Sequence, residues 1–444
     1  MRHSDQASLR IQFILQTAKF SIFPNQKSSI CRAAVEPPIA SDKLWQNVTN
    51  RKLDHKKHKQ VTTFAFGIIT SLSTLTGQAV TLNAKQQLGQ QLFFDTNLST
   101  PVGQACASCH SPKAFFVDPD KQLPTSEGAL SYLKGNRNAP TILYSAFTPT
   151  FACKTEKDNA LFCSGGLFLD GRAATLEEQA KGPFLNPLEM ANPNKQTVVT
   201  KVKQANYALL FRKVYGQGVF DDTDDAFNKI ADALAAFERT AIFKPFSSKY
   251  DYYLAGKVQL TVQEKRGLKL FEDPDKGNCA ACHPNRPMED GTPPLFTDFT
   301  YDNLGVPRNP SNPFYVAARQ HNPDSKRFVD LGLGQAVGDS GQYGKLKVPT
   351  LRNIAVTAPY MHNGYFKTLE GVVDFYSNRD IKPVCKSQWV TDTNALKIGC
   401  WPMAEVAENV NFAELGELNL SKQEINDIVA FLKTLTDHYK IKAH

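Results

Sequence analysis

The chain contains two copies of the pattern Cys-x-x-Cys-His, at residues 106–110 and 279–283. In this pattern two thiols can bond the vinyl groups of a haem, and the adjacent imidazole can reach the iron from the same side. A zinc ribbon would need cysteine pairs roughly 15–20 residues apart, whereas these pairs begin 173 residues apart. One copy alone could be a redox dithiol, but two copies that both keep the histidine favour two covalent c-type haems. The predicted haem-binding residues are Cys106, Cys109, His110, Cys279, Cys282 and His283.

The first of these haems is expected to lack a strong sixth ligand from the protein. Between His110 and His283 the sequence has no further histidine, and Met190 is its only methionine. An iron that is open on one side can bind peroxide or another small ligand. A six-coordinate electron-transfer haem is the alternative, and the missing histidines disfavour it.

The first 79 residues are predicted to be a leader and signal peptide. Three lysines within 56–59 precede an apolar stretch that begins at 61–70, and small and polar residues continue to Ala79. This order is typical of a signal peptide cleaved near Ala79 and predicts a periplasmic protein. A membrane anchor is the alternative, although the stretch is shorter than the roughly 20 apolar residues that a span needs. Residues 1–55 show no clear pattern.

The net charge of +8 comes almost entirely from this leader, because residues 1–79 hold 11 Lys and Arg but only 4 Asp and Glu. The remainder is close to neutral. A nucleic-acid-binding protein would need a basic face on its folded part. The charge distribution therefore argues against nucleic acid as a partner.

Four further cysteines form two pairs that are close in the sequence, Cys153 with Cys163 and Cys385 with Cys400. In an oxidising compartment each pair can form a disulfide that closes a short loop. Free buried thiols are the alternative. Cys31 falls in the leader.

Helices are expected to position both Cys-x-x-Cys-His motifs. Similar amphipathic segments at 89–95 and 267–273 precede them, and Thr261 with Glu264 forms a capping box for the second. This similarity indicates two copies of one small unit.

Helical periodicity also dominates much of the remaining sequence. Residues 224–240 and 421–435 each place apolar side chains on one face, and Ser421 with Glu424 forms another capping box. Strand patterns are sparse, and long loops such as 284–346 separate the helices. The sequence predicts an all-α fold with much irregular chain, divided near 243–258.

Six further segments carry a family resemblance: RNAPT at 137–141, DGR at 170–172, LEEQA at 176–180, GPFLNPLEM at 182–190, VPTLRN at 348–353 and APYMHNG at 358–364. With both haem motifs in the same order, the chain resembles the bacterial di-haem cytochrome c peroxidase and MauG superfamily over most of residues 84–435. The resemblance implies two cytochrome c-like haem domains. Residues 80–245 would hold the peroxidatic haem, and residues 246–444 the electron-transfer haem.

The resemblance also implies catalytic residues. Glu189 falls on the family's distal glutamate, Gln179 on its distal glutamine and Pro183 on a proline of the same pocket. Peroxide cleavage needs a base that moves a proton from the near to the far oxygen. A carboxylate beside the open iron can do this if its pKa is suitable.

A calcium ion between the domains is a further implication, at positions that match Asn138, Thr357 and Pro359. Amide and carbonyl oxygens suit Ca²⁺. Ordinary turn residues are the alternative.

The second haem departs from the peroxidase pattern. The family's peroxidases have a distal methionine 14 residues after the histidine that matches His362, whereas this chain has Tyr376, as MauG-type enzymes do. Met361 is the alternative ligand, and a tyrosine that only packs in a core is a third possibility. Leu169 and Gly277 stand near the positions of two tryptophans that the family uses for electron transfer.

The expected function is a periplasmic peroxidase that reduces hydrogen peroxide to water. Its electrons would come from a small redox protein such as a cytochrome c or a cupredoxin. The first alternative is a MauG-like oxidase that uses peroxide to oxidise a residue on a partner protein. The second is a non-enzymatic di-haem electron carrier. Homodimers are common in this family.

Overall fold

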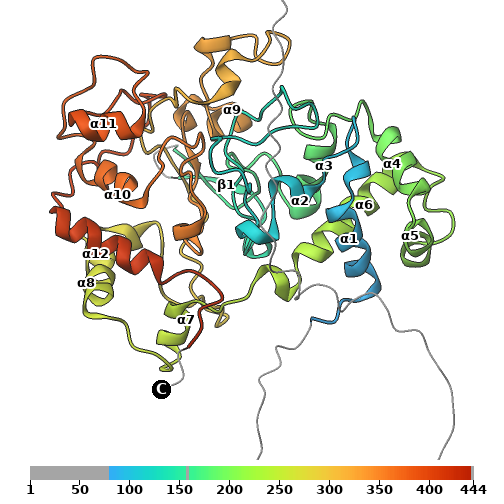
Figure 1. The fold of residues 1–444 in the computed structure, drawn as a ribbon, viewed down its shortest axis with the longest axis horizontal. Helices are drawn as coiled ribbons and strands as arrows, with labels where there is room; N and C mark the ends of the chain where they lie inside the picture. The colour runs from blue at the N-terminus through green and yellow to red at the C-terminus, as the bar shows by residue number, and fades with distance from the viewer. Residues whose placement is uncertain (1–79, 157–159, 442–444) are drawn as a thin grey trace, which may run out of the picture. The chain divides into compact units, whose positions relative to one another are not determined.

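The computed structural model describes residues 80–156 and 160–441 (Figure 1). The predicted leader and signal peptide, residues 1–79, lie outside the described residues. Helices make up most of the regular structure of the described part, which confirms the prediction of a mostly helical protein. Short strands, which the sequence pattern did not predict, form two small two-stranded sheets.

The helices of the first half precede residue 239, and those of the second half follow it. The first six are α1 (Ala84–Phe94), α2 (Cys106–Cys109), α3 (Leu176–Leu185), α4 (Lys195–Gln204), α5 (Ala208–Tyr215) and α6 (Thr223–Glu238). The other six are α7 (Lys249–Leu254), α8 (Val262–Glu272), α9 (Leu333–Val337), α10 (Leu369–Asn378), α11 (Asp392–Ile398) and α12 (Lys422–Lys433). The antiparallel sheets pair β1 (Ala152–Thr155) with β2 (Leu161–Ser164), and β3 (Tyr301–Asp302) with β4 (Leu346–Lys347).

The two helices predicted from apolar periodicity are present as α6 and α12. Their predicted stripes are buried, at Phe227, Ile230, Ala231, Leu234 and Phe237 and at Ile425, Ile428, Val429, Leu432 and Leu435. The predicted capping boxes also exist, at the start of α8 and at the start of α12. Each box satisfies backbone N–H groups that a helix leaves unpaired at its first turn.

The internal repeat appears as two crossing helix pairs, α1 with α6 and α8 with α12 (Figure 1). A Cβ added to Gly89 of α1 would lie 1.9 Å from the carbonyl oxygen of Ala233, and one added to Gly267 of α8 would lie 1.8 Å from that of Asp427. Any side chain at either glycine would therefore push the helices apart. The same close crossing supports the chain just before each Cys-x-x-Cys-His motif.

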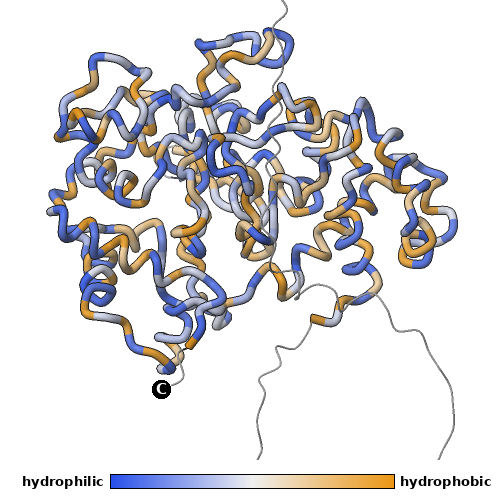
Figure 2. The backbone as a smooth tube through the Cα atoms, viewed as in Figure 1, coloured by the Kyte–Doolittle hydropathy of each residue, from blue (hydrophilic) through white to orange (hydrophobic). Residues whose placement is uncertain are grey.

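Each helix pair contributes to a large buried cluster. The first cluster runs from Leu88 to Phe243 with Leu295 and Phe299, and the second runs from Tyr250 to Leu435. Hydrophobic and hydrophilic residues alternate along the helices in Figure 2, as expected for elements with one buried face.

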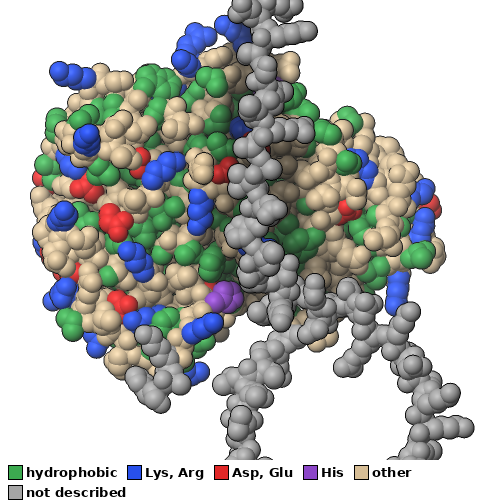
Figure 3. All heavy atoms as spheres, viewed as in Figure 1, with side chains coloured by type: hydrophobic (Ala, Val, Ile, Leu, Met, Phe, Trp, Pro, Cys, Tyr) green, Lys and Arg blue, Asp and Glu red, His purple; other side chains and the backbone are tan. Residues whose placement is uncertain are grey.

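Both predicted disulfides are present, Cys153–Cys163 and Cys385–Cys400. The first joins directly opposed residues of β1 and β2. On the face that Figure 3 shows, acidic and basic side chains are interspersed among neutral and apolar ones. Among the described residues, no helix combines the length and the apolar character that crossing a bilayer requires.

Candidate active site

The first Cys-x-x-Cys-His motif forms α2 and the residue that follows it. Its two thiols are partly exposed and are not joined to each other. Burial raises the pKa of Cys106 to about 12 and that of Cys109 to about 11. Reactive dithiols have a lowered pKa. The two thiols directly precede His110, which is the arrangement that covalent haem attachment requires.

The imidazole of His110 is oriented for metal binding through its outer nitrogen. Nδ1 lies 3.1 Å from the carbonyl oxygen of Phe116. Because a carbonyl can only accept, Nδ1 carries the proton and Nε2 keeps its lone pair, as in many metal-ligating histidines. Burial lowers the pKa of His110 and so favours the neutral imidazole that ligation requires.

The second motif repeats this arrangement. Nδ1 of His283 lies 2.8 Å from the carbonyl oxygen of Phe296, and burial again lowers the pKa of the imidazole. Burial raises the pKa of Cys279 and of Cys282 to about 12. The residues of both motifs thus fit a covalent haem with one histidine ligand each.

Helix α3 carries the predicted catalytic residues. Its N-cap is Thr175, whose hydroxyl accepts from the backbone N–H of Glu178, and its C-cap is Asn186. Gln179 lies half-buried in the second turn, and Glu189 lies half-buried in the turn that follows the helix. Among the described residues, no hydrogen bond joins Gln179 to Glu189.

Glu189 is held by the end of α3. The side-chain amide of Asn186 donates to Oε1 of Glu189 at 2.7 Å, and the backbone N–H of Glu189 donates to the carbonyl of Asn186 at 3.0 Å. Burial raises the pKa of Glu189, while the Asn186 hydrogen bond and the charge of Arg172 oppose that rise. The charge of Glu189 in turn helps to raise the pKa of Cys106 and of Cys109, so the carboxylate lies near the first motif.

The two predicted ligands for a second haem, Tyr376 and Met361, pack on the same cluster as Cys279. Tyr376 lies on α10, and burial together with the Cys282 and Cys279 thiols raises the pKa of its phenol. Met361 adopts a left-handed backbone conformation, with φ of 69°. Such a backbone is uncommon outside glycine and is held by its surroundings.

The three residues predicted to bind calcium meet at a small cavity of about 10 Å³. Asn138 donates its side-chain amide to the carbonyl oxygen of Pro359 at 2.6 Å, and Thr357 lines the same space. The buried hydroxyl of Thr125 also lines it and has no hydrogen-bond partner among the described residues. An ion here would need the Asn138 amide to rotate, so that its oxygen rather than its nitrogen faces the cavity.

Sequence reasoning missed a buried ionic group around Arg137. Nε and Nη2 of Arg137 donate to the two carboxylate oxygens of Asp330 at 2.6 and 2.7 Å, and Nη1 donates to Asp170 at 2.6 Å. Arg137 holds the pKa of Asp330 well below its usual range. Arg137 and Asp170 lie in the motifs of the family resemblance, but no local pattern indicates the distant partner Asp330.

Sequence reasoning also missed Glu238, which lies buried near the end of α6. Burial raises its pKa to about 8, and its charge is among the causes that raise the pKa of Cys106. A carboxyl therefore lies close to the first motif on the side of α6. In the sequence, the feature that could have indicated this group is a charged residue directly after Phe237, at the end of a helix with an apolar face.

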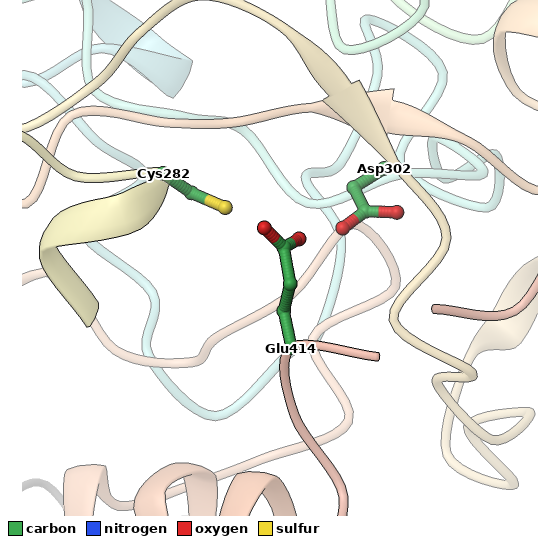
Figure 4. A group of neighbouring side chains, drawn as sticks. All are labelled: Cys282, Asp302 and Glu414. Atoms are coloured by element: carbon green, nitrogen blue, oxygen red, sulfur yellow. The ribbon is translucent and has the colours of Figure 1, made fainter. Parts of the chain in front are cut away.

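One further group of possible metal ligands belongs to the second motif. Ligand atoms of Cys282, Asp302 and Glu414 lie within 4.8 Å of one another. In Figure 4 the Glu414 carboxylate lies between the sulfur and the Asp302 carboxylate. Cys282 belongs to the second Cys-x-x-Cys-His motif, so this group overlaps the predicted haem attachment.

Comparison with known proteins identifies the family of the chain. The model of the di-haem cytochrome c peroxidase family matches residues 83–259. The chain is 39% identical over 363 residues to the methylamine utilization protein MauG of Paracoccus denitrificans, covering 80% of this chain and 89% of that protein. The chain belongs to the di-haem cytochrome c peroxidase family. It is therefore an oxidoreductase with two c-type haems.

Other members of the di-haem peroxidase family are similar over comparable lengths. The cytochrome c551 peroxidase of Nitrosomonas europaea is 30% identical over 351 residues, which are 79% of each protein. The crystal structure of the diheme peroxidase BthA of Burkholderia thailandensis matches with a TM-score of 0.67 and 31% identity, covering 80% of this chain and 86% of that one.

Proposed function

We propose that this protein is a periplasmic peroxidase that reduces hydrogen peroxide to two waters, using two protons and two electrons from a small redox protein. The observation that carries the proposal is the position of Glu189. Its carboxylate has a raised pKa and lies near the first motif, and the sequence has no further histidine between His110 and His283. A carboxylate in such a place can act as a general base and acid.

The two buried clusters support two cytochrome c-like domains, residues 80–245 for the peroxidatic haem and residues 246–444 for the electron-transfer haem. The thiols of each motif would bond one haem, and His110 and His283 would ligate the two irons. When bound, each haem would supply an iron that exchanges electrons, and the first would supply the iron that reacts with peroxide.

Glu189 and Gln179 then have different roles toward peroxide. Glu189 accepts a proton from the oxygen nearer the iron and returns it to the far oxygen, which leaves as water. Gln179 can donate a hydrogen bond that orients the peroxide. Asn186 fixes the Glu189 carboxylate through their 2.7 Å hydrogen bond.

At the second iron, Tyr376 is the proposed sixth ligand, with Met361 as the alternative. Burial favours the neutral phenol of Tyr376, so a phenolate there would depend on the charge of the ferric iron. The calcium site at Asn138, Thr357 and Pro359 also remains a proposal, supported by the cavity that these residues share.

A MauG-like activity is the second candidate, favoured by the 39% identity to MauG and by Tyr376. The surroundings of the two tryptophans in the described part argue against oxidation of either indole during such an activity. Lys382 lies 5.2 Å from the ring centre of Trp401, and Arg308 lies 6.0 Å from that of Trp389. A cation over the ring disfavours the positive charge of an oxidised indole.

The deciding experiment mixes peroxide with the fully ferric holoprotein, with and without a reduced small cytochrome c. The peroxidase proposal predicts steady peroxide loss only with the donor, and two donor molecules oxidised for each peroxide. Rapid peroxide consumption by the ferric protein without the donor would favour the MauG-like activity. In that case, a partner protein added afterwards should become oxidised. If no peroxide is lost under either condition, the remaining function is that of a non-enzymatic electron carrier.

A further inference from the structure

Lys347 extends its side chain from strand β4 to a loop of the first half of the chain. Its ammonium donates to the carbonyl oxygen of Gly166, and its backbone N–H donates to that of Leu169 at 2.8 Å. Tyr301, the partner of Lys347 in the β3–β4 sheet, donates its hydroxyl to the carbonyl oxygen of Gly165 at 2.5 Å. The two strands therefore hold the ammonium of Lys347 at a fixed place between the two halves.

This ammonium has no carboxylate partner among the described residues. Lys347 forms no ion pair there, and Gly166 is the one acceptor of its Nζ. The carboxylate of the nearby Asp170 is already bound by the guanidinium groups of Arg137 and Arg172. Burial lowers the pKa of Lys347 to about 8, and the charge of Asp170 only partly opposes this. A lysine ammonium has three N–H donors, so two remain for an anion that would offset the cost of burial.

The chain that follows Lys347 belongs to the second Cys-x-x-Cys-His motif. The backbone of Pro349 interacts with the imidazole of His283 and opposes the lowering of its pKa. The carbonyl oxygen of Val348 accepts from the hydroxyl of Thr297 at 2.6 Å, directly after the residue whose carbonyl binds Nδ1 of His283. Lys347 thus lies on the loop that holds the histidine ligand of the second haem.

The first half contains the same loop without a charge at this position. Residues 138–141 (NAPT) correspond to residues 347–350 (KVPT). The hydroxyl of Thr141 donates to the carbonyl oxygen of Phe115 at 2.7 Å, and that of Thr350 to the carbonyl oxygen of Leu295 at 2.6 Å. The neutral Asn138 occupies the place of Lys347, so the loop does not need a cation in order to fold.

We propose that Lys347 binds a propionate carboxylate of the haem attached at residues 279–283. An ammonium and a carboxylate form a charge-assisted hydrogen bond, and the propionates are the carboxylates that the cofactor itself brings. Lys347 is then a positioning residue, which ties this haem to the loop at Gly166 and keeps a positive charge beside it. The inference goes beyond the peroxidase function and would hold equally for an electron carrier.

Resonance Raman spectra of the ferric holoprotein test the contact itself, because the bending mode of a haem propionate rises in frequency when the carboxylate accepts a hydrogen bond. In Lys347→Gln one propionate mode should move to lower frequency, since a neutral amide is a weaker donor than an ammonium. In Lys347→Arg the same mode should also move, because a guanidinium donates from different positions. The control Lys326→Gln removes an exposed cation of the same half and should leave every propionate mode unchanged.

Redox titration gives a second readout, which a purely structural role would not move. Lys347→Gln should shift the reduction equilibrium of the haem bound to His283 at least about fivefold toward the ferric form, because a nearby positive charge is lost. Lys347→Arg and Lys326→Gln keep that charge and should shift it less than about twofold. The change of its signal in His283→Gly identifies this haem.

Unchanged propionate modes in both Lys347 variants overturn the proposal. A redox shift that is confined to the haem bound to His110 overturns it as well, and so does an equal shift in Lys347→Gln and Lys326→Gln. Lys347→Arg carries the Raman test if Lys347→Gln does not take up both haems.

Discussion

The side-chain amide of Asn186 donates a 2.7 Å hydrogen bond to Oε1 of Glu189, across the turn that ends α3. This bond favours the ionised carboxylate and so opposes the effect of burial on its pKa. The oxygen of the same amide accepts from the backbone N–H of Leu188 at 3.0 Å, which fixes the orientation of Asn186. One residue at the end of a helix thus influences the pH range in which Glu189 can accept a proton.

Replacing Glu189 with Gln should lower kcat/KM for peroxide by a factor of about 10²–10⁴, because the amide cannot accept the proton. Stopped-flow measurement of peroxide consumption gives this number. The control is Glu178→Gln, an exposed carboxylate of the same helix, which should leave the rate unchanged. An unchanged rate in Glu189→Gln would remove this carboxylate from the mechanism.

Replacing Asn186 with Ala should move the acid side of the pH–rate profile to higher pH. Burial already raises the pKa of Glu189, and loss of the hydrogen bond from Asn186 raises it further. The carboxylate is then protonated over a wider range, so the rate at low pH falls more than the rate at high pH. The profile of kcat/KM is the measurement, with Asn228→Ala as the control. A uniform loss at every pH would show that Asn186 only supports the fold.

Glu238 should make stability fall as the pH rises. Its folded-state pKa of about 8 lies above the ordinary value of about 4.3, so the folded protein holds a proton that the unfolded chain releases. Stability from this proton is fully present below about 4.3 and is lost as the pH rises through 8. The free energy of unfolding of Glu238→Gln should therefore rise relative to that of the parent protein, by up to about 1.4 kcal/mol for each pH unit in that window. Urea unfolding at pH 5 and pH 8 checks this, and an equal difference at both values would refute it.

Arg137→Gln should cost roughly 3–5 kcal/mol of unfolding free energy, because it leaves the buried carboxylate of Asp330 without its cation and removes one of the two guanidinium groups that bind Asp170. The control Arg239→Gln removes one member of an exposed pair with Glu177 and should cost about 1 kcal/mol or less. Because the pKa of Asp330 is depressed, its contribution exists above the ordinary aspartate pKa and is lost as the pH falls. Similar costs for the two variants would contradict the role of the buried group.

Local patterns were enough to predict the elements that carry the haem motifs. The capping boxes at Thr261 and Ser421 mark true helix starts, and the apolar stripes of α6 and α12 are buried. Both disulfides were predicted from short sequence separations in a chain that is expected to be exported. Each of these features depends on residues that are close in the sequence, so periodicity and spacing contain the information.

Contacts between distant segments could not be predicted in this way. Arg137 and Asp330 are 193 residues apart, and neither residue type indicates its partner. The hairpin of β1 and β2 has strands of four residues, too short for an alternating pattern to stand out. The burial of Glu238 depends on how α6 packs, and its hydrophilic side chain suggested a solvent-exposed position.

The proposed function requires that the iron bound to His110 has an open coordination position facing Glu189. Low-temperature electron paramagnetic resonance of the fully ferric holoprotein tests it most directly. The expected spectrum contains a high-spin signal from this iron and a low-spin signal from the iron bound to His283. Low-spin signals from both irons of the fully ferric protein, with no high-spin signal, would contradict it.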